Sequence, residues 1–84
     1  MGLQRQPMEK KFIELICYVM ELEEHTPELS DRFDAFQEWD SMAQLTLMME
    51  LKETFGFAID VPELRSIDTL GELYRRIQAE ITKH

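Results

Sequence analysis

The sequence predicts an all-α fold, a small four-helix bundle with three main helices and one short helix. Two observations predict it. Apolar residues recur at three- and four-residue steps in three segments, the spacing of one helix face. The sequence has neither the alternating pattern of strands nor an internal repeat. With 84 residues, we expect a single domain over 1–84.

The first helix is predicted over 7–24, with Pro7 at or before its first turn and Thr26-Pro27 beyond its end. One apolar stripe runs along it: Met8, Phe12, Leu15, Ile16, Val19 and Leu22. Ile13, Cys17 and Met20 lie off this stripe. We therefore expect the helix to be covered on two flanks, or to offer a contact surface.

A long acidic loop is expected over 25–40, and connections of this length are usually functional or fixed by their own side chains. Phe33, Phe36 and Trp39 follow one another at three-residue steps. They could form one short helical turn or anchor the loop in the core. We expect anchoring, because exposed aromatic side chains are costly.

The second helix is predicted over 41–55, and Gly56 suits its C-terminal end. Its apolar arc exceeds half of the helical circumference, so it either packs on several sides or packs on one and binds on another. A short helix is expected over 61–66, with a proline at an early position. The last helix is expected over 69–82, because Thr69 and Glu72 can form a capping box.

The formal net charge is −8, from 9 basic and 17 acidic residues. Such a surface repels phosphate backbones and anionic lipids, so we expect no nucleic-acid or membrane partner and favour partners with basic patches. The longest apolar run, Leu15 to Met20, is too short to span a bilayer. Because a single cysteine cannot form an internal disulfide, we expect a cytoplasmic protein. We also expect a monomer.

The sequence offers little for catalysis. His25 and His84 are far apart and lack the companions of a metal site. Cys17 lies in an apolar helical segment, which favours a buried structural thiol. The three glycines are scattered, so no phosphate-binding loop is present. We expect neither an enzyme nor a metal site.

Ser41 stands at the start of the second predicted helix and permits two interpretations. It can cap the helix, since Ser41 and Gln44 form an S-x-x-Q box. Alternatively, its hydroxyl is exposed there, and a phosphate attached to it would meet free amides and the positive end of the helix dipole. Asp40 beside it could help to recruit a modifying enzyme.

Asp40-Ser41-Met42 resembles the D-S-L signature of acyl carrier proteins. The following segment, Leu45 to Ile59, reads L-x-L-M-M-x-L-x-x-x-F-G-F-x-I, with apolar residues where that family's second helix has them. Ile67-x-Thr69-Leu70-Gly71-x-Leu73 is similar to the family's I-x-T-V-G-x-L segment. The resemblance extends over nearly the whole chain.

This resemblance implies that Ser41 carries 4′-phosphopantetheine, with Asp40 in support. A phosphopantetheinyl transferase would attach the group from coenzyme A with the help of Mg²⁺. The protein would then carry acyl groups as thioesters between acyl-loading and acyl-processing enzymes. Met48, Met49 and Phe55 could line a pocket for the acyl chain, although the alternative is that they fill the core.

The chain departs from the family along the second helix. Fatty-acid-synthesis carriers present acidic residues at the positions of Ala43, Thr46, Lys52 and Glu53, and here only Glu53 is acidic. We therefore expect a specialised fatty-acid, polyketide or other secondary pathway. The expected docking face consists of Met42, Thr46, Met49 and Glu53. The alternatives are an aminoacyl or peptidyl carrier, or an unmodified helical adaptor.

Overall fold

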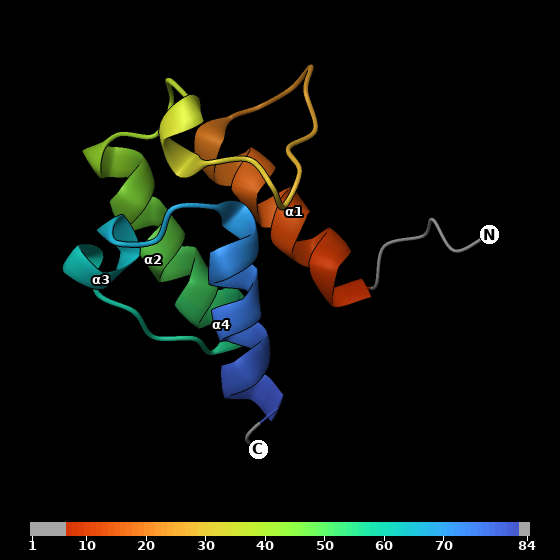
Figure 1. The fold of residues 1–84 in the computed structure, drawn as a ribbon, viewed down its shortest axis with the longest axis vertical. Coiled ribbons are helices and arrows are strands. Elements are labelled where there is room, and N and C mark those ends of the chain that lie inside the picture. Colours follow the sequence, from red (N-terminus) through yellow and green to blue (C-terminus); the bar gives the residue numbers. More distant parts are fainter. Residues whose placement is uncertain (1–6, 83–84) are drawn as a thin grey trace.

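The computed structural model describes residues 7–82 and confirms the small helical bundle. Its four α-helices are α1 (Pro7–Met20), α2 (Ser41–Phe55), α3 (Val61–Arg65) and α4 (Leu70–Thr82). A short 3₁₀ helix, Phe33–Ala35, interrupts the connection between α1 and α2 (Figure 1). Residues 7–82 contain no strand beyond one isolated bridge between Arg32 and Thr69.

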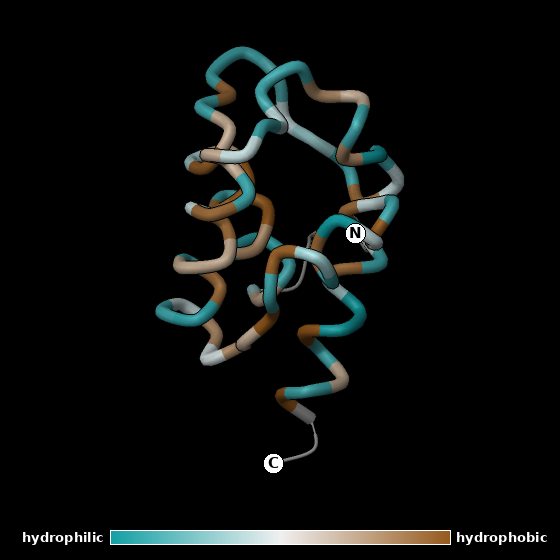
Figure 2. Tube along the Cα trace, turned by 90° about the vertical axis from the view of Figure 1, so that its left-hand side faces the viewer, coloured by the Kyte–Doolittle hydropathy of each residue, from teal (hydrophilic) through white to brown (hydrophobic). Residues whose placement is uncertain are grey.

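The core forms where α1, α2 and α4 pack together, and Figure 2 shows apolar residues recurring along these helices between hydrophilic ones. The fully buried side chains include Phe12, Ile16, Leu47, Leu51, Leu73 and Ile77. Ile13 and Met20, which lie off the predicted stripe of α1, are also buried. The sequence left open whether α1 is covered on two flanks or offers a contact surface. Over most of its length, α1 is covered on two flanks.

Helix α1 ends at Met20, four residues before the predicted end at Glu24. Glu21 adopts the left-handed conformation with φ of 55°. Its amide donates to the carbonyl of Tyr18 at 3.3 Å, and the Leu22 amide donates to the carbonyl of Cys17 at 2.9 Å. This pair of bonds is a Schellman motif, which closes the helix. The motif usually has glycine where this chain has glutamate, so the sequence pattern did not reveal it.

The loop between α1 and α2 is held by its backbone against the start of α4. The carbonyls of Asp31 and Leu29 accept from the amides of Leu70 and Gly71 at 3.0 and 2.7 Å. The first amides of a helix have no acceptor inside the helix. These bonds therefore give an acceptor to two amides of α4 and a donor to two carbonyls of the loop. The loop that leads into α2 is thereby fixed to the first turn of α4.

The aromatic residues of this loop anchor it, as predicted. Phe33 is buried, and Trp39 stacks on it with ring centroids 4.4 Å apart and planes 30° apart. Phe36 is half-buried, with its ring 6.0 Å from that of His25. Since Phe33 also begins the 3₁₀ helix, the loop contains both a short helical turn and core anchors.

The remaining helix ends differ little from expectation. Helix α2 spans the range that the sequence pattern indicates, and Gly56 ends it with φ of 66°. Helix α3 ends at Arg65, with Ser66 as its C-cap rather than its last residue.

Helix α4 begins at Leu70, one residue later than predicted, because Thr69 is its N-cap and lies outside the helix. The Thr69 hydroxyl accepts from the Glu72 amide at 3.1 Å. The Glu72 carboxylate accepts from the Asp68 amide at 3.3 Å. In the predicted capping box it would accept from the amide of Thr69, one residue later.

Candidate functional site

Ser41 is the first residue of α2, and its side chain is exposed. The loop that reaches it is fixed just upstream by the stacking of Trp39 on Phe33. The Trp39 amide also donates to the carbonyl of Phe36 at 3.1 Å. Ser41 therefore lies on the surface at the junction of a well-anchored loop and a long helix.

The cap of α2 is Asp40 and not Ser41, so of the two interpretations of Ser41 the S-x-x-Q cap is wrong. A carboxylate oxygen of Asp40 accepts from the Ala43 amide at 2.9 Å, and Asp40 has extended backbone angles, φ −124° and ψ −172°. A charged acceptor at the positive end of a helix outcompetes a neutral hydroxyl. The Gln44 side chain instead accepts from Arg65 Nε at 3.1 Å and ties α2 to α3. The Ser41 hydroxyl is thus not needed for the cap.

Two backbone amides remain open beside this hydroxyl. Asp40 takes the Ala43 amide with its side chain and the Gln44 amide with its carbonyl, at 2.9 and 3.0 Å. Within residues 7–82, the amides of Ser41 and Met42 have no acceptor. At α4, by contrast, the corresponding amides of Leu70 and Gly71 donate to loop carbonyls. The start of α2 therefore offers two donors and a positive dipole end to an anion.

The four residues of the predicted docking face lie on one side of α2 but differ in exposure. Met42 and Met49 are 70% and 60% exposed, and Glu53 is also exposed. Thr46 is half-buried, because it lines a groove against α1. Leu45, which the prediction omitted, is 46% exposed. The wide apolar arc of α2 was the sequence signal for it, since a core-facing stripe alone needs fewer apolar positions.

The predicted acyl pocket is not supported for Met49, because that side chain faces solvent. Met48 and Phe55 are half-buried and pack against the core. Their positions match the core-filling alternative.

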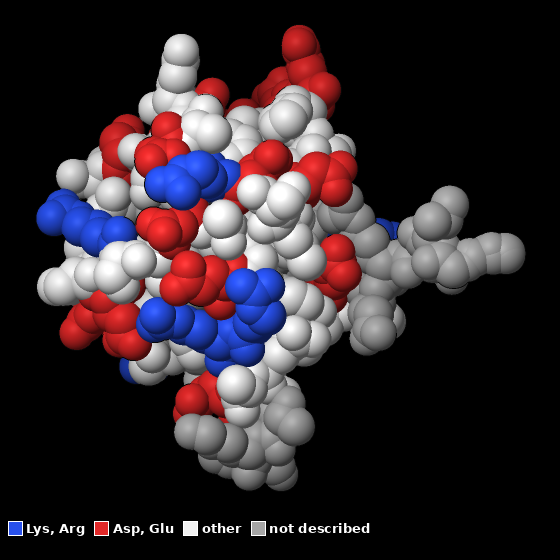
Figure 3. All heavy atoms as spheres, in the orientation of Figure 1, with Lys and Arg blue, Asp and Glu red and all other residues white. Residues whose placement is uncertain are grey.

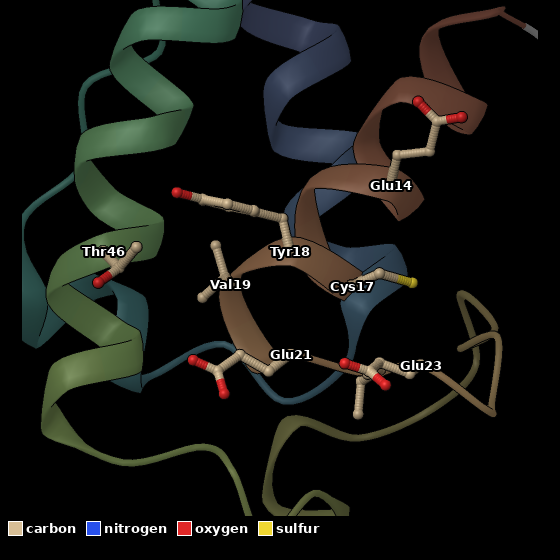
Figure 4. A pocket seen from close by; sticks show the side chains of 8 residues that line it. Glu14, Cys17, Tyr18, Val19, Glu21, Glu23 and Thr46 are labelled. Atoms are coloured by element: carbon tan, nitrogen blue, oxygen red, sulfur yellow. The ribbon is translucent and has the colours of Figure 1, made fainter.

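A groove runs between the C-terminal half of α1 and the N-terminal half of α2. Its larger part, about 660 Å³, is lined by Glu14, Tyr18, Glu21 and Thr46 among others (Figure 4). A smaller part, about 300 Å³, shares Val19, Glu21 and Thr46 and reaches Asp40 and Met42. We refer to these two connected parts as the α1–α2 groove. In Figure 4, Tyr18, Val19 and the Glu21 carboxylate point from α1 and its end toward α2.

Acidic residues dominate the loop that follows α1. Figure 3 shows acidic side chains over the tip of this loop and basic ones gathered over α4. Arg32 pairs with Asp34 at 3.1 Å, and this hydrogen bond from the guanidinium lowers the pKa of Asp34 below its ordinary value. Arg32 is the one basic residue among eight acidic ones in 21–40, so most loop carboxylates have no such partner from the loop. In the described part of the chain, no helix has the length and apolarity needed to cross a membrane.

Among the described residues, His25 and Cys17 are not part of a cluster that could hold a metal ion. Residues 7–82 contain no group of three or more side chains that could hold a metal ion. His25 lies beside Phe36, and His84 lies outside the described residues. Cys17 is half-buried rather than fully buried, and Figure 4 shows its sulfur directed away from α2.

Comparison with protein families matches residues 10–77 to the model of a family described as phosphopantetheine attachment site. The matched span contains all of α2 and α3, the acidic loop and most of α1 and α4. Comparisons with curated proteins and with solved structures gave no match.

Proposed function

Because the chain belongs to the phosphopantetheine-attachment family, we propose that Ser41 is the residue to which its prosthetic group is joined. The cofactor of this domain is covalent 4′-phosphopantetheine, and the domain is a carrier rather than an enzyme. Carrier domains work with a phosphopantetheinyl transferase and with acyl-processing enzymes. The observation that supports Ser41 is its exposed hydroxyl at the start of α2, released from capping by Asp40.

The surroundings of Ser41 suit a phosphodiester. The open amides of Ser41 and Met42 and the positive end of α2 favour negative charge at this position. Asp40 supports the site by holding the first turn of α2, so that Ser41 keeps its exposed position when the hydroxyl is esterified.

The attachment reaction needs only a nucleophilic oxygen from this chain. Ser41 Oγ would form a bond to the phosphorus of coenzyme A that bears the pantetheine arm. The bond from that phosphorus to the bridging pyrophosphate oxygen breaks, and adenosine 3′,5′-bisphosphate leaves with the electron pair. The hydroxyl proton passes to a base of the transferase or to solvent. The Mg²⁺ would enter with the transferase and coenzyme A.

We further propose that the cargo is an acyl group of a specialised fatty-acid, polyketide or other secondary pathway. When bound, the arm supplies a terminal thiol on which acyl groups are held as thioesters. The docking face supports a specialised partner, because Met42 and Met49 expose apolar surface on it and Thr46 stands where fatty-acid-synthesis carriers present an acid to a basic enzyme face. A reducing cytoplasm suits both the free thiol of the arm and the single cysteine of the chain.

Intact-mass spectrometry tests the attachment. The unmodified protein is incubated with coenzyme A, Mg²⁺ and a broad-specificity transferase. Wild type and Ser30→Ala, an exposed serine in the loop, should each gain one phosphopantetheinyl group, and Ser41→Ala should gain none. A gain in Ser41→Ala, or no gain in wild type, would overturn the proposal. Mass analysis of the thioester on protein from its native cell then separates an acyl cargo from an aminoacyl or peptidyl one.

A further inference from the structure

The α1–α2 groove opens directly beside Ser41. Its smaller part is lined by Asp40 and Met42, the two chain neighbours of Ser41. Its larger part continues along α1 to Tyr18 and Glu14. An enzyme that reaches the Ser41 hydroxyl therefore lies next to this groove.

The groove combines apolar surface with negative charge. Two large side chains of the groove are exposed, Tyr18 by 67% and Met42 by 70%. Five carboxylates line the two parts: Glu14, Glu21, Glu23, Glu38 and Asp40. Among the described residues that line it, the groove has no lysine or arginine.

We propose that the α1–α2 groove is a docking surface for the transferase that modifies Ser41, which would insert an apolar side chain flanked by lysine or arginine. This inference rests on the proposed function of Ser41. Coenzyme A carries a pyrophosphate and a further phosphate, so an enzyme that holds it needs basic residues around its active site. Those basic residues complement the groove carboxylates when the active site stands over Ser41.

Other occupants fit the groove less well. A second copy of this chain would bring its own net charge of −8 against the five carboxylates. Anionic lipid and nucleic acid are disfavoured by the same repulsion. An acyl chain would leave Glu21 and Thr46 against hydrocarbon, which is costly for polar groups.

Charge reversal at Glu21 tests the proposal, because Glu21 lines both parts of the groove. Lysine keeps a side chain at this left-handed position, so the backbone requirement is unchanged. Glu80→Lys, at an exposed position of α4, is the matched control, since either reversal raises the net charge by two, from −8 to −6. We expect Glu21→Lys to lower kcat/KM for phosphopantetheinylation by about tenfold and Glu80→Lys by less than about twofold.

A second pair of variants tests the apolar contact. Tyr18→Ala should lower the same kcat/KM by about tenfold, through KM, while Ile81→Ala, at a partly exposed position of α4, should not. Equal rates for Glu21→Lys and Glu80→Lys, together with an unchanged Tyr18→Ala, would overturn the groove proposal alone, because wild type is still modified. Absence of modification in wild type would instead overturn the function proposed for Ser41, and this inference with it.

Discussion

The amide of Gly71 donates a 2.7 Å hydrogen bond to the carbonyl of Leu29, and a Cβ on Gly71 would stand 2.9 Å from that same oxygen. This contact joins the acidic loop to the first turn of α4. The loop approaches the helix closely enough for the bond only because residue 71 has no side chain.

Gly71→Ala should therefore lower the free energy of unfolding by about 1–3 kcal/mol, since the added methyl group meets backbone rather than a flexible side chain. Urea denaturation followed by circular dichroism measures the change. Glu80→Ala, at an exposed position of the same helix, should change stability by less than about 0.5 kcal/mol. A Gly71→Ala variant as stable as this control would mean that the loop can move away from α4 at little cost.

Asp40 and Ser41 should differ in their contribution to stability. Asp40→Ala removes the acceptor of the Ala43 amide and should cost about 1 kcal/mol. Ser41→Ala removes a hydroxyl that the cap does not use and should cost less than about 0.5 kcal/mol. Denaturation of both variants beside wild type tests this order. A larger loss in Ser41→Ala would assign the cap to the serine instead.

Glu21→Gly should stabilise the protein. Glu21 has φ of 55°, a conformation that costs a residue with a side chain about 1–2 kcal/mol and costs glycine little. After subtraction of the larger backbone entropy of glycine in the unfolded chain, we expect a gain of about 0.5–1 kcal/mol. The thermal midpoint should rise in Glu21→Gly and not in Glu24→Gly, which lies in the exposed loop. A lower midpoint in Glu21→Gly would contradict the strain argument.

The sequence predicts the helices well where local signals suffice and poorly where tertiary contacts decide. Gly56 ends α2 through a conformation that glycine favours, so its position is visible in the sequence. Glu21 ends α1 through the same kind of conformation without that signal. The sequence therefore predicts the end of α1 at Glu24, four residues too late.

At the candidate site, the sequence indicates the position of Ser41 but not the role of its neighbours. Serine and aspartate both favour the N-cap, and only the geometry shows that Asp40 takes it. The α1–α2 groove could not be predicted, because Tyr18 and Thr46 come together through the packing of two helices separated by a long loop.

Tyr74 makes stability depend on pH in the alkaline range. Burial, followed by the negative charge of Glu9, raises the pKa of Tyr74 above its ordinary value of 10.0. The folded protein thus keeps this phenol protonated at pH values where the unfolded chain ionises it. Its contribution is fully present below about pH 10 and is lost as the pH rises from there toward the folded-state pKa. The free energy of unfolding should fall over this interval.

Tyr74→Phe isolates this effect, because it keeps the ring that packs 5.3 Å from Phe12 and removes the ionisable hydroxyl. The difference in unfolding free energy between wild type and Tyr74→Phe should be constant from about pH 8 to about pH 10. Above that range wild type should lose stability relative to the variant. Tyr18→Phe, which alters an exposed hydroxyl, should follow wild type throughout. A constant difference between wild type and Tyr74→Phe up to about pH 11 would contradict the assignment, because it would mean that the phenol ionises as easily in the folded protein as in the unfolded chain.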